Sequence, residues 1–139
     1  MENYVEGIKV EENGTLSFGN FTIKEKQKVD DFVYDNNTYS LRTYNKATKL
    51  EKNQELLLET TPGAVVHNFY KENKDSVTFD IIGTTDTIVT LQLESDTLYR
   101  VTSGKNNLGS MLSNSAGKVK FSVELGDGRT QSVSVVSRG

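Results

Sequence analysis

The segment Lys118–Leu125, K-V-K-F-S-V-E-L, places an apolar residue at every second position. Successive side chains of a β-strand point to opposite faces, so this spacing predicts a strand with one buried and one solvated face. Gly126–Gly128 follows as a predicted turn, because glycine and aspartate favour tight turns. The run Gln131–Val136, Q-S-V-S-V-V, is then expected to return as the closing strand.

The same alternation recurs along the rest of the chain. Asn13-Gly14 lies between two alternating runs and predicts a type I′ hairpin. Residues 24–28 suit a solvated loop or edge, and residues 103–107 suit a loop. Residues 46–61 suit either a short helix or a strand, and a strand is favoured from Glu55 to Thr60. Further predicted strands are Phe21–Ile23, Phe32–Tyr34, Tyr39–Thr43, Glu55–Thr60, Ala64–Tyr70, Val77–Ile81, Val89–Leu93 and Leu98–Thr102, with turns at 35–38, 72–75 and 83–86.

Strands separated by turn residues, without a βαβ unit or an amphipathic helix, predict an all-β fold. At 139 residues the chain has the length of one ordinary domain. We therefore expect a single domain over residues 1–139, folded as an antiparallel two-sheet β-sandwich of a jelly-roll-like kind. A partly open β-barrel is the alternative.

Six segments between Val5 and Leu125 carry a resemblance to a known family. They read V-E-G-I-K-V-E-E-N-G-T-L-S-F-G-N-F-T-I, T-K-L-E-K-N, T-T-P-G, T-L-Y-R-V, N-N-L-G-S-M and G-K-V-K-F-S-V-E-L. In these segments the chain resembles small all-β proteins of anaerobic Firmicutes that are often labelled "endosialidase". The segments are turns and strand cores, so the resemblance implies a fold and a lineage and supplies no catalytic residues.

Composition argues against several classes of partner. The formal net charge is −3 and the isoelectric point is near 5.2, which leaves no basic surface for nucleic acid. No run of apolar residues is long enough for a membrane-spanning helix, and the first residues lack the pattern of a signal peptide. We therefore expect a cytoplasmic protein without membrane insertion, with export by a route that uses no signal peptide as the alternative. Cysteine is absent, which removes disulfides and thiolate chemistry.

Catalytic motifs are missing from the sequence. The single histidine, His67, lies in V-V-H-N-F-Y, where alternation places it on the same face as Val65 and Phe69 and opposite Val66. This pattern favours a partly buried or sheet-surface histidine, and we assign no catalytic residues. A small glycan hydrolase, as the family label suggests, is the third functional hypothesis, and it would use some of Asp30, Asp31, Glu55 and His67.

Two groups of residues suggest weak binding sites. Oxygen donors that suit Ca²⁺ cluster around one turn, at Asp30, Asp31, Asp35, Asn36 and Asn37, although turn formation explains the same residues. Asp30 and Asp31 are neighbours, so a regular strand would point them to opposite faces. Tyr34, Tyr39 and Tyr70 could stack on sugar rings if exposed, whereas core packing is the simpler interpretation.

The leading functional hypothesis is a non-catalytic structural or protein-binding module. Strands such as Gln131–Val136 carry little charge, and an uncharged edge strand invites pairing with another chain. We therefore expect a homo-oligomer or a complex with a protein partner. A carbohydrate-binding module is the alternative.

Overall fold

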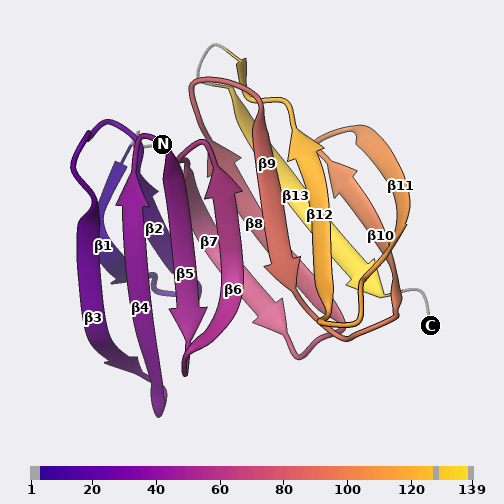
Figure 1. Cartoon of the computed structure of the whole chain (residues 1–139), viewed down its shortest axis with the longest axis horizontal. Coiled ribbons are helices and arrows are strands. Elements are labelled where there is room, and N and C mark those ends of the chain that lie inside the picture. The colour runs from indigo at the N-terminus through magenta and orange to yellow at the C-terminus, as the bar shows by residue number, and fades with distance from the viewer. Residues whose placement is uncertain (1–3, 127–128, 138–139) are drawn as a thin grey trace.

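The computed structural model describes residues 4–126 and 129–137, and these residues form mainly β-strands (Figure 1). The strands are β1 (Tyr4–Val10), β2 (Leu16–Asn20), β3 (Gln27–Tyr34), β4 (Asn37–Tyr44), β5 (Ala47–Lys52), β6 (Glu55–Thr61), β7 (Val65–Glu72), β8 (Ser76–Ile82), β9 (Thr87–Gln92), β10 (Leu98–Ser103), β11 (Asn106–Leu112), β12 (Lys118–Val123) and β13 (Thr130–Ser137). No helix within the described ranges is long and apolar enough to cross a membrane.

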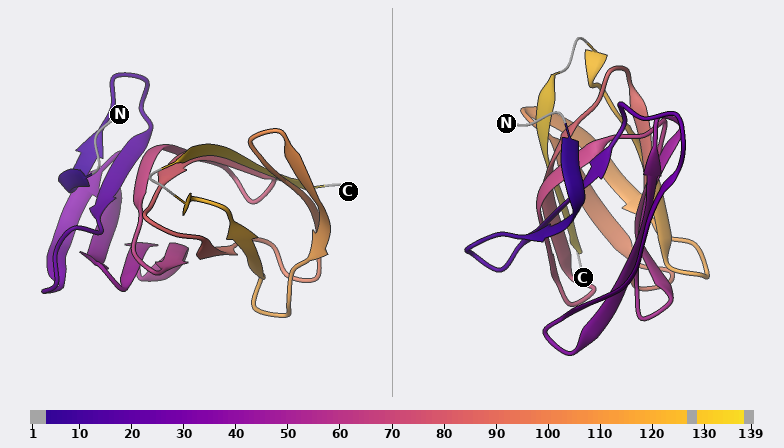
Figure 2. Two further views of the ribbon diagram at one scale, coloured as in Figure 1. Left: turned by 90° about the horizontal axis from the view of Figure 1, so that it is seen from above. Right: turned by 90° about the vertical axis from the view of Figure 1, so that its left-hand side faces the viewer.

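The strands form two antiparallel sheets that pack against each other as two layers (Figure 2). The seven-stranded sheet has the order β1-β2-β7-β8-β13-β10-β11, and the six-stranded sheet has the order β12-β9-β6-β5-β4-β3. The two sheets do not close into a barrel. The prediction of a two-sheet sandwich is therefore confirmed, in preference to the partly open barrel.

One hydrophobic core fills the space between the sheets and runs from Ile8 in β1 to Val135 in β13. In β12 the alternation has the predicted effect, since Val119, Phe121 and Val123 are buried and the residues between them are exposed. Aromatic rings connect the first half of the seven-stranded sheet, with centroids 6.0 Å apart between Phe18 and Phe69 and again between Phe69 and Phe79.

The hairpin turns differ in detail from those predicted. A type I′ turn needs positive φ at both central residues, and at Asn13-Gly14 only Gly14 has it, at 83°. The loop is closed instead by the amide of Glu11 donating to the carbonyl of Thr15 over 2.8 Å, so the type I′ prediction is wrong here. Asp35-Asn36 does fit such a turn, with φ values of 52° and 63°, and β4 begins directly after it.

Other boundaries were also predicted wrongly. Phe21–Ile23 forms no strand, because the Asn20 side chain accepts a hydrogen bond from the Thr22 amide at 2.9 Å and turns the chain. Within residues 46–61, where helix and strand were both open, the chain forms β5 and β6, whereas β11 begins within the predicted 103–107 loop. Strand β12 ends at Val123, and Asp127 and Gly128 of the predicted turn lie outside the described residues.

The hydroxyl of Tyr99 connects β10 to two loops. It donates a hydrogen bond to the carbonyl of Lys74 at 2.7 Å and accepts one from the amide of Glu94 at 3.0 Å, while the residue is fully buried. Burial raises the pKa of Tyr99, so the hydroxyl keeps its proton at neutral pH. The two hydrogen bonds connect the loop after β7, a strand of the seven-stranded sheet, with the loop after β9, a strand of the six-stranded sheet.

Replacing Tyr99 with Phe should therefore lower the free energy of unfolding by about 1–3 kcal/mol, because the amide of Glu94 loses its buried partner. Urea denaturation measures the change. Tyr4→Phe is the control, since Tyr4 is 53% exposed and its replacement should leave stability unchanged. Equal stability of the Tyr99→Phe variant and the unaltered protein would contradict the structural role of the hydroxyl.

Candidate functional site

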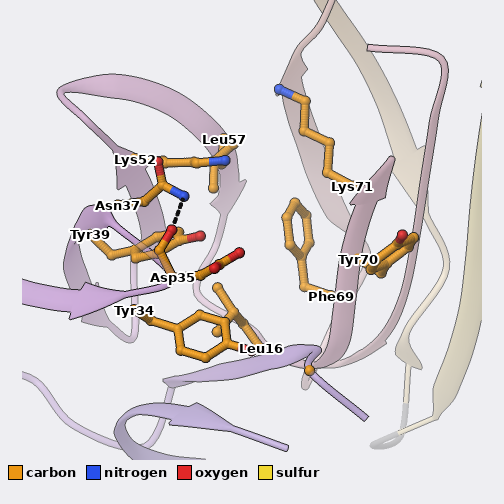
Figure 3. Close-up of a pocket in the computed structure, with 11 residues that line it drawn as sticks. Leu16, Tyr34, Asp35, Asn37, Tyr39, Lys52, Leu57, Phe69, Tyr70 and Lys71 are labelled. Atoms are coloured by element: carbon orange, nitrogen blue, oxygen red, sulfur yellow. Dashed lines mark hydrogen bonds between the residues drawn. The ribbon is translucent and has the colours of Figure 1, made fainter. Parts of the chain in front are cut away.

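A cleft of about 190 Å³ opens between the two sheets (Figure 3). It lies at the end of the sandwich where hairpins β3–β4, β5–β6 and β7–β8 turn. We call it the tyrosine cleft, and its lining residues are Gly14, Leu16, Tyr34, Asp35, Asn37, Tyr39, Lys52, Leu57, Phe69, Tyr70 and Lys71. A second hollow of about 370 Å³ adjoins it and shares Asn37, Lys52, Leu57 and Lys71. The two spaces form one groove across the end of the sandwich.

Hairpin β3–β4 supplies the polar wall of the tyrosine cleft. The Asn37 side-chain amide donates to the backbone carbonyl of Asp35 at 3.0 Å, which fixes both residues beside the turn. Tyr39 is only 7% exposed, and burial raises the pKa of its hydroxyl, with smaller contributions from Asp35 and Tyr34. The phenol therefore remains a neutral hydrogen-bond donor at the base of the cleft.

A bulge in β7 sets which of its side chains enter the cleft. The register of β7 against β8 shifts between His67 and Tyr70, and Asn68 lies between them with φ of 57°. Val66 and Phe69 consequently both join the main core, whereas Val65 belongs to a separate cluster. The prediction that His67, Val65 and Phe69 share a face is wrong, because the extra residue reverses the alternation after Asn68.

Three hydrogen bonds hold Asn68 in this conformation. Its backbone amide donates to Ser17 Oγ at 3.2 Å, and its Oδ1 accepts from Thr15 Oγ1 at 3.2 Å. Its Nδ2 donates to Asp80 Oδ2 at 3.4 Å. The β1–β2 hairpin and β8 thus fix the bulge from both sides.

The bulge divides the three predicted tyrosines. Tyr34 and Tyr39 both line the cleft from the six-stranded sheet, with Tyr34 partly buried and Tyr39 packed in the main core. Tyr70 contributes to the rim, but its ring points to the other side of β7 from Phe69 (Figure 3), and the residue is 50% exposed. Its cross-strand partner Thr78 is likewise exposed, so Tyr70 belongs to the outer face of the seven-stranded sheet.

Lysines from both sheets meet at the second hollow, which we call the lysine hollow. Its lining residues are Asn37, Lys52, Asn53, Glu55, Leu56, Leu57, Lys71, Lys74, Gln92 and Leu93. Lys71 Nζ donates to the carbonyl of Gln92 at 3.4 Å. Burial lowers the pKa of Lys71, the charges of Lys52 and Lys74 lower it further, and Glu55 acts in the opposite direction.

The candidate calcium ligands are divided between two places. A bulge interrupts β3 between Val29 and Phe32, and Asp31 there has φ of 56°. Asp30 and Asp31 therefore line one hollow beside Tyr39, which corrects the expectation that they point to opposite faces. Asp30 is paired with Arg42, with Oδ1 and Nη2 2.8 Å apart.

Asp35 and Asn37 instead line the tyrosine cleft, with Asn36 in the turn between them. Within residues 4–126 and 129–137, no group of three or more histidine, aspartate or glutamate residues is arranged to hold a metal ion.

The residues named for a hydrolase are also separated. His67 is buried in β7 and lies opposite Asp80 of β8 in the seven-stranded sheet. Glu55 lines the lysine hollow, whereas Asp30 and Asp31 line a separate hollow formed by β3, β4 and the turn after β5. The fold therefore does not assemble these four residues into one site.

Sequence reasoning missed the three lysines. Lys52, Lys71 and Lys74 come from β5, β7 and the turn after β7, so no local spacing links them. The only clue in the sequence is Asn68 within an apolar run, because asparagine adopts the left-handed conformation more readily than most residues.

No family model, curated protein or solved structure matches the chain. The resemblance to the small Firmicutes proteins thus stays an expectation, and the cleft itself has to support any functional argument.

The left-handed backbone at position 68 should reverse the usual order of stability of glycine and alanine variants. Asn68→Gly and Asn68→Ala both remove the side-chain amide, but only alanine bears the left-handed strain of about 1–2 kcal/mol. We therefore expect the Ala variant to be less stable than the Gly variant in urea denaturation.

Ser122→Gly and Ser122→Ala are the controls for this reversal, because Ser122 is an exposed residue of β12. There glycine should be less stable than alanine by about 0.5–1 kcal/mol, because a regular strand costs glycine more conformational entropy. The same order at both positions would argue against the bulge.

Proposed function

We propose that this chain is a non-catalytic carbohydrate-binding module and that the tyrosine cleft is its ligand site. The observation that carries the proposal is the convergence of Tyr34 and Tyr39 with Asp35 and Asn37 at one cleft. A sugar ring combines apolar C–H faces with hydroxyl groups. The partly buried ring of Tyr34 suits the former, and the carboxylate, the amide and the hydroxyl of Tyr39 suit the latter.

The floor and size of the cleft also suit a single sugar ring. Leu16, Leu57 and Phe69 form an apolar floor between the sheets. A volume of about 190 Å³ lies below the roughly 300 Å³ at which pockets for drug-sized ligands begin. One ring would fill the cleft, and the remainder of an oligosaccharide would extend along the lysine hollow.

The non-catalytic part of the proposal is supported by the separation of the hydrolase candidates. A glycosidase holds two carboxyl groups on either side of the bond that it cleaves. Asp30 and Asp31 lie outside the cleft, Asp30 is engaged with Arg42, and His67 is buried in β7. Binding by the residues of the cleft requires none of them.

Replacing Tyr34 with Leu should weaken binding of an oligosaccharide by at least about tenfold, because the ring face is lost while an apolar side chain remains. A glycan array would identify the oligosaccharide, and calorimetry would measure its affinity. Tyr4→Leu is the control, since Tyr4 lies on β1, is 53% exposed and is not among the lining residues of the cleft, so its replacement should leave affinity unchanged. A glycan array without a binder, or equal loss in both variants, would refute the proposal.

A second candidate function, self-association, is favoured by the edge strand β11. Strand β13, expected from its low charge to promote pairing, lies between β8 and β10 and is not an edge. The edges are β1, β11, β3 and β12, and β11 alone among them has no charged residue. Uncharged edges are those most open to pairing with another chain.

Exposed apolar side chains adjoin this edge. Leu98 and Leu112 are direct cross-strand partners, 42% and 66% exposed, and Val136 lies on the next strand with 44% exposure. Antiparallel pairing of two β11 strands would place no like charges opposite each other. A second copy of the chain is therefore the partner that this edge fits best.

Leu112→Lys should weaken self-association, because each copy would then bring a positive charge to the shared edge. Sedimentation equilibrium at increasing protein concentration measures the effect. Val33→Lys is the control, since Val33 is 69% exposed but lies on β3, at another edge. A strictly monomeric protein at high concentration would remove this candidate function.

A further inference from the structure

Three lysines gather in a third hollow that continues the groove. This hollow has a volume of about 420 Å³, and its lining consists of Lys52, Lys71, Asn73 and Lys74. Lys52 and Lys71 also line the tyrosine cleft and the lysine hollow. The three amino groups, which we call the lysine triad, thus lie beside the proposed sugar site.

The fold brings the triad together from opposite sheets. Lys52 is the direct cross-strand partner of Tyr39, so its side chain lies on the inner face of the six-stranded sheet. Lys71 is the partner of the buried Val77, which places it on the inner face of the seven-stranded sheet. Figure 3 shows these two side chains extending toward the same opening from different strands.

The triad places three amino groups at one part of the groove, while the carboxylates of Asp35 and Glu55 line the neighbouring parts. Among the described residues, the ion pairs are Lys9–Glu11 and Arg42–Asp30, and neither involves the triad. The lowered pKa of Lys71 has Lys52 and Lys74 among its causes, as expected for like charges held close together. Glu55 offsets this repulsion only in part.

Such an arrangement is unfavourable in the free protein, because like charges repel and Lys71 is also partly desolvated. It occurs in a chain whose net charge is −3, so this cluster of lysines is local and does not reflect the overall composition. A bound anion would relieve the repulsion and would accept hydrogen bonds from the amino groups and from the side-chain amide of Asn73.

We propose that the lysine triad binds an oxyanion, such as a carboxylate, sulfate or phosphate group, carried by the saccharide whose ring occupies the tyrosine cleft. The assignment of the oxyanion to a saccharide rests on the proposed function. The ligand class is therefore an acidic oligosaccharide rather than a neutral one. Lys52 and Lys71 belong to the triad and also line the tyrosine cleft, so one ligand can contact both.

The test compares ligands that differ mainly in charge. Tetragalacturonate and its methyl ester share one sugar backbone, and only the former is anionic. Calorimetry should give an affinity for tetragalacturonate at least about tenfold higher than for its ester, and added salt should reduce the difference. A sulfated disaccharide and a sugar phosphate, measured beside them, identify which oxyanion binds most tightly.

Lys52→Gln and Lys74→Gln should each reduce the affinity for tetragalacturonate at least about tenfold and reduce that for the ester much less, because the ester brings no carboxylate to the amino groups. Lys118→Gln and Lys120→Gln make the same change of charge on the exposed face of β12 and should have little effect. Thermal unfolding verifies that the variants fold, and we expect no loss of stability because the substitutions remove repulsion.

The possible failures are distinguishable. Equal affinity for the acid and its ester, unaffected by the lysine substitutions, would overturn the oxyanion inference and leave saccharide binding intact. Binding of inorganic phosphate that requires Lys52 and Lys74, without binding of any saccharide, would support the oxyanion site and overturn the proposed function. Absence of binding to every probe would overturn both.

Discussion

The left-handed backbone of Asn68 determines which side chains of β7 reach the space between the sheets. With strict alternation from Val66, the chain would turn Tyr70 inward and would expose Phe69 and Lys71. The bulge reverses this arrangement, so that Phe69 forms part of the floor of the tyrosine cleft and Lys71 joins the triad. The hydrogen bonds that Asn68 makes with Ser17, Thr15 and Asp80 offset the cost of this conformation.

The groove lies where the sheets end, and its polar residues are held by tight turns rather than by long loops. Asp35-Asn36 and Asn53-Gln54 each have two residues with positive φ, which is the geometry of a two-residue hairpin. Such turns place Asn37 and Lys52 at the ends of rigid strands. The core farther along the same strands excludes water, so charged and neutral polar side chains can gather at one end without weakening it.

The fold was more predictable than the site, for a physical reason. Side-chain alternation is a local property, so strands such as β12 and β6 could be predicted from the sequence, and turn residues marked several hairpins. Strand β11 was missed because Asn106 and Asn107 resemble loop residues and its edge position removes the alternation. A one-residue bulge at Asn68 or Asp31 leaves no periodic pattern, and it reverses the assignment of every following side chain.

Pairing between distant strands decides the rest, and it is not a local property. The triad depends on β5 and β7 facing each other from different sheets, which no spacing between Lys52 and Lys71 encodes. In the seven-stranded sheet, β11 is one edge and β1 is the other. Strand β7, which lines the cleft, lies on the β1 side, separated from β11 by β8, β13 and β10. Two copies joined through β11 would therefore leave both clefts open. Under the proposed function, such a pair would hold a repeating saccharide more tightly than one shallow cleft could, because binding at one site raises the effective concentration of ligand at the second.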